Sequence, residues 1–141
     1  MKKVIDIQKV QPAAFKAMAR LDNYISATSL SNIEKELIKL RTSQVNGCTF
    51  CIELHTKIAI DSGETPERIA ALSSWSQNDL FTAKEKALLK LTEEVTKISE
   101  GVSDAAYDSI SAYYSDEVIA EIVMIIVTIN AWNRISIASR L

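Results

Sequence analysis

Apolar residues recur along most of the chain with the three- and four-residue spacing of amphipathic helices, and polar capping residues separate the apolar segments. Seven helices are predicted. The first three cover residues 12–27 with Pro12 in the first turn, the segment from the Ser31–Glu34 capping box to about Val45, and residues 48–63. The fourth starts at Thr65 and Pro66, the fifth runs from the Thr82–Glu85 capping box to about Ser99, and Ser103 and Ser115 cap the last two. The pattern therefore favours an all-α fold of about seven helices.

The last predicted helix is the most apolar part of the chain. Its sequence IVMIIVTI is rich in β-branched residues and is also compatible with a buried strand, but the apolar pattern runs from Val118 past Ile135, which is too long for a typical strand. Apolar side chains occur all around this segment, so we expect it in the core or at a subunit contact. Glu121 and Asn130 interrupt it, so it falls short of the ~20 apolar residues needed to cross a bilayer.

Composition and charge narrow the class of protein. A length of 141 residues predicts a single domain over residues 1–141, and 48% hydrophobic residues with only 3 Gly and 2 Pro favour helices over many short strands. The net charge of −2 makes nucleic acid and anionic membranes improbable partners. The first residues contain no apolar segment of the kind that directs secretion, so we expect a cytoplasmic protein.

The only two cysteines and the only histidine of the chain form a CxxCxxxH motif of Cys48, Cys51 and His55. Helical spacing places them on one face together with Ile58, directed to the interior or to a cleft. A thiolate is the form of cysteine that attacks peroxides and disulfides, and both a helix N-terminus and an imidazole favour it. Cys48 lies at the helix start and His55 lies one turn after Cys51, so these two effects leave open which thiol is the more acidic.

The preceding helix contributes a candidate carboxylate. Glu36 lies at the border of the apolar stripe formed by Leu37 and Leu40, and a partly buried carboxylate can exchange protons near neutral pH. Arg41 lies on the same side, and we expect it to pair with an acidic residue for structural reasons. A turn separates Glu36 from the cysteines, so spacing alone does not bring them together.

The sequence around these residues is similar to a known family. The pattern EL..LR.SQ.NGC..C...H, the following SGET segment and the INAWNR segment near the C-terminus carry the likeness, through Glu36, Leu37, Leu40, Arg41, Ser43, Gln44, Asn46, Gly47, Cys48, Cys51, His55 and residues 129–134. These residues resemble the carboxymuconolactone decarboxylase family, and within it the alkylhydroperoxidase D-like branch. The resemblance implies an all-α alkylhydroperoxidase D-like fold and a homo-oligomer, often a trimer or hexamer.

The resemblance also implies a peroxidase mechanism with no metal or organic cofactor. The cysteine matching Cys51 attacks the peroxide, the cysteine matching Cys48 closes the disulfide, and the residues matching His55 and Glu36 relay the proton. Implied partners are a dithiol reductant, in the best-known case a lipoyl-bearing protein, and a peroxiredoxin. Thr49 and Phe50 depart from peroxidases that carry a histidine between the cysteines. The lactone decarboxylases that name the family generally lack the cysteine pair.

Several alternatives accompany this interpretation. The cysteines could be a buried structural pair, or could bind zinc together with His55 and Glu36. The same disulfide could serve a non-enzymatic redox sensor or assembly protein, and lactone chemistry would not need the cysteines. We interpret the aromatic residues, including Trp75 and Trp132, as packing, and the charged helix face that includes Lys90, Glu93 and Glu94 as solvated and without a function.

Overall fold

The computed structural model describes residues 2–140, and in that range the chain is built of helices without strands. In chain order the elements are α1 (Ile7–Val10), α2 (Pro12–Ser26), α3 (Asn32–Asn46), α4 (Thr49–Asp61), α5 (Pro66–Ala71), the 3₁₀ segment η1 (Leu72–Gln77), α6 (Ala83–Thr96), the 3₁₀ segment η2 (Ile98–Glu100), α7 (Asp104–Ser111) and α8 (Asp116–Ser139). The prediction of an all-α fold is confirmed, and the seven predicted helices correspond to α2–α8.

The predicted caps account for most helix starts. In both capping boxes, Ser31–Glu34 and Thr82–Glu85, the cap side chain accepts a hydrogen bond from the backbone N–H three residues on, and the glutamate side chain accepts one from the cap's own N–H. Thr65, Ser103 and Ser115 cap α5, α7 and α8 in the simpler one-bond form.

One predicted helix ends earlier than expected, another continues as a 3₁₀ segment, and one short helix was missed. The helix after Pro66 gives way to 3₁₀ geometry at Leu72, and α6 ends at Thr96, so its last predicted residues lie in η2. Helix α1 was missed because its four residues are too few to show the repeating apolar spacing of a helix. The Asp6 side chain caps it by accepting a hydrogen bond from the Lys9 N–H. The Ile5 N–H donates to the Ser139 carbonyl, which ties this N-terminal segment to the end of α8.

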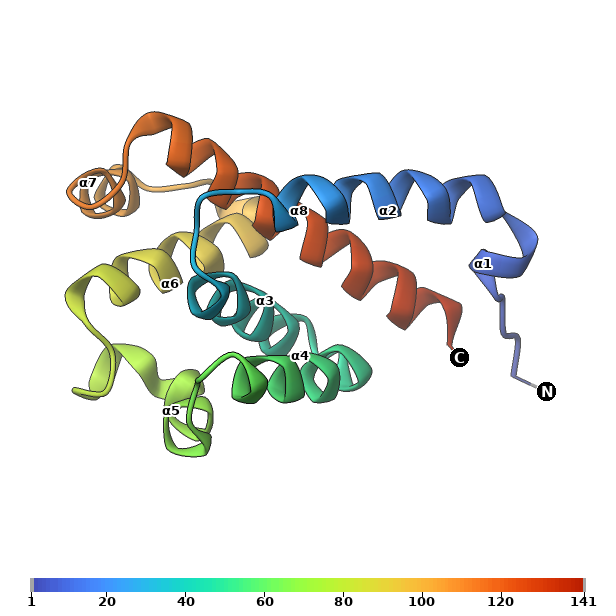
Figure 1. Ribbon diagram of the computed structural model, residues 1–141, viewed down its shortest axis with the longest axis horizontal. Coiled ribbons are helices and arrows are strands. Elements are labelled where there is room, and N and C mark those ends of the chain that lie inside the picture. Colours follow the sequence, from blue (N-terminus) through green and yellow to red (C-terminus); the bar gives the residue numbers. More distant parts are fainter. Residues whose placement is uncertain (1, 141) are drawn as a thin grey trace.

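α8 is the central helix of the core. In Figure 1 it crosses the molecule with α2 along one side and α3 and α6 beneath it. Its buried isoleucines pack with residues of α3, α6 and α7 in the larger of two apolar clusters: Ile25, Leu30, Ile38, Ala87, Leu88, Leu91, Ala106, Ile110, Ile119, Ile122, Ile125 and Ile126. The smaller cluster joins α3 and α4 to η1 and α6 through Leu37, Leu40, Ala59, Leu72, Phe81 and Leu89.

By length and composition alone, α8 is long and apolar enough to cross a membrane, because it has 24 residues and contains an 18-residue window with a mean hydropathy of 1.6. The buried core helix of a soluble protein meets the same criterion, so this finding does not contradict the expectation that the segment is not a membrane span. In the fold its apolar residues are used for packing: Ile119, Ile122 and Ile125 are buried in the core. The prediction of a helix rather than a strand is confirmed.

The reversal between α3 and α4 places the cysteine motif. Gly47 adopts a left-handed conformation with φ of +70°, its N–H donates to the Gln44 carbonyl, and the Cys48 N–H donates to the Ser43 carbonyl. These bonds end α3 and make Cys48 the N-cap of α4. As a result α4 folds back along α3, and the two helices lie side by side.

Candidate active site

Cys48 and Cys51 form a disulfide at the start of α4. Their Cα atoms are 5.3 Å apart, as expected for residues separated by three positions, where the first is the N-cap and the second lies in the first turn. Both side chains are buried, with exposed fractions of 2% and 5%. A reagent can therefore reach the sulfur atoms only through an opening in the protein.

The α3–α4 reversal brings Glu36 to His55. Nδ1 of His55 lies 2.8 Å from Oε1 of Glu36, whose side chain is buried. An ionised Glu36 accepts a hydrogen bond from Nδ1–H, which leaves Nε2 of the neutral ring as a proton acceptor. The structure thus joins two of the predicted site residues directly.

Lys39, which the sequence analysis did not single out, lies one turn after Glu36 on α3. Its ammonium nitrogen is 3.4 Å from Oε2 of Glu36. Glu36 therefore contacts the imidazole with one carboxylate oxygen and the ammonium with the other. The i, i+3 spacing of Glu36 and Lys39 was a readable signal, but only the fold shows that the carboxylate between them is buried.

Cys51, His55 and Lys39 share the wall of a cavity of about 750 Å³. Most of its other wall residues are apolar or aromatic and come from α1, α2, α4 and α8: Ile7, Phe15, Ile25, Phe50, Leu54, Ile129, Trp132 and Ile135. Cys48 is not among the residues that line it. Of the two sulfur atoms, that of Cys51 therefore belongs to the residue that faces the space where a small molecule can bind.

The amino-acid sequence matches the profile of a known protein family over residues 12–94, a range that contains all four candidate residues. The profile is that of the carboxymuconolactone decarboxylase family. This chain belongs to the carboxymuconolactone decarboxylase family.

Relatives extend the likeness to the whole chain. The uncharacterized protein YdfG of Bacillus subtilis (strain 168) is 40% identical over 139 residues, which are 98% of this chain and 95% of the relative. A crystal structure from Agrobacterium tumefaciens is 40% identical with a TM-score of 0.95, covering 99% of this chain and 96% of that one. That protein is of unknown function and is provisionally named antioxidant defence protein AhpD.

A more distant structure has the same fold. The debrominase Bmp8, solved in complex with 2,3,4-tribromopyrrole, is 22% identical with a TM-score of 0.85, covering 94% of this chain and 72% of that one. The chain thus has the alkylhydroperoxidase D-like fold that the sequence predicted.

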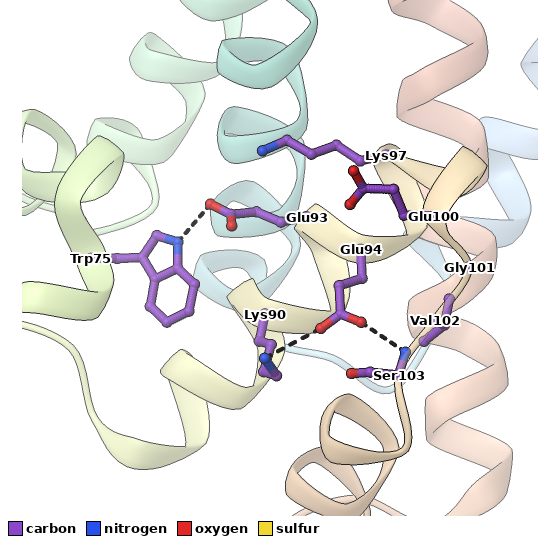
Figure 2. A pocket seen from close by; sticks show the side chains of 9 residues that line it. All are labelled: Trp75, Lys90, Glu93, Glu94, Lys97, Glu100, Gly101, Val102 and Ser103. Carbon is purple, nitrogen blue, oxygen red and sulfur yellow. Dashed lines mark hydrogen bonds and ion pairs between the residues drawn. The ribbon is translucent and has the colours of Figure 1, made fainter.

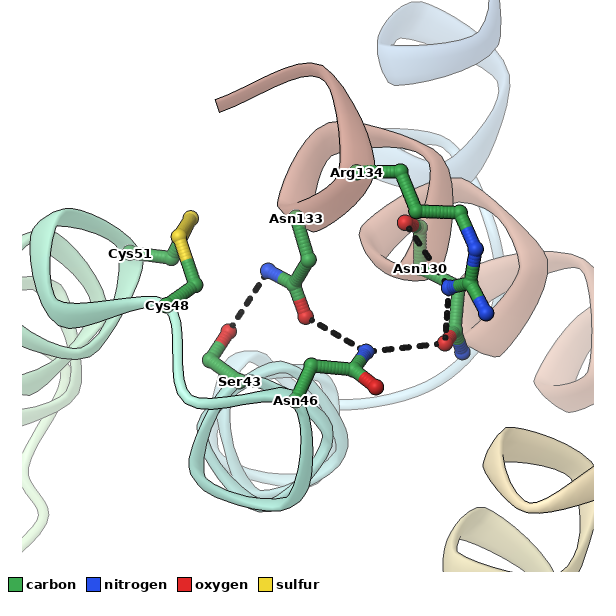
Figure 3. Close-up of a disulfide and its surroundings, with 7 residues drawn as sticks. All are labelled: Ser43, Asn46, Cys48, Cys51, Asn130, Asn133 and Arg134. Carbon is green, nitrogen blue, oxygen red and sulfur yellow. Dashed lines mark hydrogen bonds between the residues drawn. A yellow bond between two sulfur atoms is a disulfide. The ribbon is translucent and has the colours of Figure 1, made fainter. Parts of the chain in front are cut away.

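A polar network behind the disulfide fastens α3 to α8 in this family member, and Figure 3 shows it beside the two sulfur atoms. The Asn46 side-chain amide donates to Oδ1 of Asn130 (2.9 Å) and of Asn133 (3.0 Å). The amide of Asn133, which is fully buried, donates to Oγ of Ser43 at 3.1 Å. Ser43 and Asn46 immediately precede the cysteines, so the network fixes the cysteine turn against the helix that forms the opposite cavity wall.

One expectation about side-chain placement was wrong, and a second is extended by the structure. Ile58 was placed on the inward face with the cysteines, but it is 38% exposed and the neighbouring Ala59 is buried instead. Helix α4 packs mainly against α3 and touches α8 to a smaller extent, so its buried stripe is narrow. Trp132 was assigned to packing alone, yet it lines the cavity, with its Nε1–H donating to Asp22 at 2.9 Å and its ring edge-on to Phe15.

A second, polar cavity of about 530 Å³ lies between Trp75 and the loop after η2 (Figure 2). Arg41 pairs with an acid as predicted: its Nε donates to Glu93 at 2.7 Å, and Nε1–H of Trp75 donates to the same oxygen. Glu93, placed on a solvated face, therefore links three elements. The pKa of Glu94 is lowered by hydrogen bonds from Ser103, first of all from its backbone N–H.

The zinc alternative required Cys48, Cys51, His55 and Glu36 to converge on one ion. Here the sulfur atoms are bonded to each other, while Glu36 and His55 bond to one another. Within residues 2–140, no group of three or more His, Cys, Asp and Glu side chains is arranged to hold a metal ion. The metal content of the purified protein is measured separately from its free thiols.

Proposed function

We propose that the protein is a thiol-dependent peroxidase that reduces organic hydroperoxides with the Cys48–Cys51 pair. The observation that carries the proposal is the position of Cys51: it is bonded to Cys48, and it shares a cavity wall with a histidine whose other nitrogen is held by a buried carboxylate. This arrangement supplies a nucleophile, a resolving thiol and a proton acceptor.

The cycle starts from the reduced pair. The Cys51 thiol gives its proton to Nε2 of His55, with Glu36 stabilising the imidazolium through Nδ1. The thiolate attacks the hydroperoxide, its O–O bond breaks, and Cys51 becomes a sulfenic acid while the alkoxide takes up the proton and leaves as an alcohol. The Cys48 thiol then attacks the Cys51 sulfur, water leaves, and the disulfide is restored.

The cavity favours an organic substrate. A volume of about 750 Å³ with a largely apolar and aromatic wall exceeds what hydrogen peroxide requires and is in the range of small-molecule sites. Burying the apolar body of a hydroperoxide against residues such as Phe15 and Trp132 contributes binding free energy that hydrogen peroxide cannot supply. We therefore expect organic hydroperoxides to react faster than hydrogen peroxide.

The reductant is proposed to be a dithiol that enters the same cavity. Both cysteines are too buried for the thiol of a folded protein surface to reach them, whereas a dihydrolipoyl group on a flexible arm of a partner protein is narrow enough. Such a dithiol would attack the disulfide at Cys51 and leave as an oxidised ring. A peroxiredoxin as a further partner and the cytoplasm as the location remain predictions of the sequence analysis.

The deciding experiment counts free thiols on the reduced protein before and after one equivalent of cumene hydroperoxide. Wild type is expected to lose two thiols, and Cys48→Ser is expected to accumulate a sulfenic acid on Cys51 that dimedone traps. Cys51→Ser is expected to be inert and serves as the matched control. Peroxide consumption that survives the loss of both cysteines would overturn the proposal, because the peroxide would then react at another site.

Turnover separates an enzyme from a sensor. With dihydrolipoamide in excess, the proposal requires many equivalents of hydroperoxide to be reduced by each protein molecule. A single oxidation followed by no turnover with any dithiol would support the sensor alternative.

A further inference from the structure

Lys39 is a cation on the wall of the reaction cavity. Its side chain is 19% exposed, its ammonium nitrogen lies 3.4 Å from Oε2 of Glu36, and it shares that wall with Cys51 and His55. We propose that Lys39 is a catalytic residue whose ammonium stabilises the oxygen that leaves the hydroperoxide when Cys51 attacks. This inference rests on the proposed peroxidase function and adds a residue to it.

The chemistry of the attack is favoured by such a group. As the Cys51 thiolate forms a bond to the terminal peroxide oxygen, the O–O bond breaks and its electron pair passes to the second oxygen, which becomes an alkoxide. An alkoxide is a strong base, so a positive group beside it lowers the barrier, most effectively in a site with few competing waters. The alkoxide finally takes the proton that His55 received from Cys51, and Lys39 remains an ammonium.

Lys39 is the permanent cation among the described residues that line the cavity. The two acidic residues of the wall are occupied elsewhere: the Asp6 side chain accepts from the Lys9 N–H, and Asp22 accepts from the Trp132 indole. His55 becomes positive only when it takes a proton. In the proposed cycle His55 carries that proton when the thiolate attacks and loses it to the alkoxide, whereas Lys39 keeps its positive charge through the whole step.

Glu36 fixes this cation relative to the proton acceptor. One carboxylate oxygen contacts Nδ1 of His55 and the other contacts the ammonium of Lys39, so base and cation are held by the same buried group. An ammonium has three N–H donors, and the ion pair with Glu36 at 3.4 Å occupies at most one of them. The remaining donors are free to serve a substrate oxygen in the cavity.

The competing interpretation is that Lys39 only neutralises the buried carboxylate. The two roles differ in their response to the leaving group. A structural role affects every peroxide alike, because it acts through the position of Glu36 and His55. A role at the leaving oxygen matters for a strongly basic alkoxide and hardly at all for a carboxylate, which leaves readily without help.

The test compares cumene hydroperoxide with perbenzoic acid, two probes with an aromatic ring and different leaving groups. Rate constants for Cys51 oxidation are measured by stopped flow on the reduced protein, for wild type, Lys39→Met and Lys39→Arg. Lys39→Met is expected to slow the reaction with cumene hydroperoxide by about 100-fold and the reaction with perbenzoic acid by less than about 3-fold. The larger figure is the size of effect seen when one charge-stabilising donor is removed. Lys39→Arg, which keeps the charge, is expected to retain most of the activity.

Lys35→Met is the matched control, because Lys35 is a buried lysine of the same helix whose ammonium donates to the Ser26 carbonyl. For Lys35→Met, the ratio of the rate constant with cumene hydroperoxide to that with perbenzoic acid should equal the ratio for wild type. Equal slowing of both probes in Lys39→Met, or no slowing, would overturn the inference and leave the peroxidase proposal intact. If neither probe oxidises the wild-type protein, the inference about Lys39 and the peroxidase proposal both fail. Should Lys39→Met not fold, Lys39→Gln with the same pair of probes decides the matter.

Discussion

Glu36 is the residue on which the polar groups of the site converge, since it contacts His55 and Lys39 with separate oxygens. Glu36→Gln keeps the size of the side chain but removes the charge that stabilises an imidazolium. We expect it to slow Cys51 oxidation by about 100-fold, within the range for a lost acid–base partner. Stopped-flow measurement with cumene hydroperoxide checks this.

Glu64→Gln is the matched control for that variant. Glu64 is similarly buried and ion-paired, with Arg68 at 2.7 Å, but it lies outside the reaction cavity. Its substitution should reduce stability without changing the rate of oxidation. If both variants slow the reaction equally, the carboxylate of Glu36 has no specific part in it.

The sequence was informative about residues that lie within two turns of one helix. Cys48, Cys51 and His55 could be assigned to a common site from spacing alone, because helical geometry fixes their relative positions. Glu36 could be suspected but not placed, since its contact with His55 depends on how the turn at Gly47 reverses the chain. Lys39 was not singled out and Trp132 was interpreted only as packing, because their positions in the cavity wall depend on how several helices pack.

At the scale of elements, Gly47 is the position on which the geometry of the cysteine turn depends. Its φ of +70° is costly for residues with a Cβ, although a Cβ there would have no neighbour within 4 Å. Gly47→Ala should therefore lower the free energy of unfolding by about 1–2 kcal/mol through backbone strain alone. Urea unfolding of the reduced protein measures it.

Gly47→Asn gives the comparison, because asparagine tolerates the left-handed conformation better than alanine. It should be the more stable of the two variants. An alanine variant as stable as wild type would show that the turn can adopt another conformation. In that case the hydrogen bond from the Cys48 N–H to the Ser43 carbonyl should also be lost, with consequences for the position of the disulfide.

Helix boundaries were predictable where a side chain determines them. The boxes at Ser31 and Thr82 and the caps at Ser103 and Ser115 act within four residues, so their signals are local. Helix α1 was not predictable in this way, because it is held partly by the bond between Ile5 and Ser139 at the opposite end of the chain. Local sequence carries no information about such a contact.

For the whole molecule, the cavity beside Cys51 is a product of packing. Residues from the N-terminal segment, α2, α3, α4 and α8 line it, and the polar network of Asn46 and Asn133 holds two of those helices together. Each helix could be predicted separately, but the space between them depends on how their faces fit. The proposed preference for organic hydroperoxides therefore rests on the cavity and not on the CxxCxxxH motif.

The assembly of the protein is the last property to predict. Phe50, Leu54 and Ile58 follow one another at four-residue spacing on α4 and form an exposed apolar stripe. A stripe of this kind is typical of a contact with another subunit, in agreement with the homo-oligomer that the family resemblance implies. We expect sedimentation velocity to detect an oligomer and Ile58→Glu to shift it towards the monomer.

Ile60→Glu tests whether that effect belongs to the stripe. Ile60 has the same exposed fraction as Ile58, 38%, but lies about 200° further around the helix, at 100° per residue. Its substitution adds the same charge to the same helix and should leave the oligomer unchanged. A monomeric wild type, or equal dissociation of both variants, would contradict the stripe as the subunit contact. Since Phe50 and Leu54 also line the cavity, a stripe contact would place the subunit boundary beside the reacting sulfur.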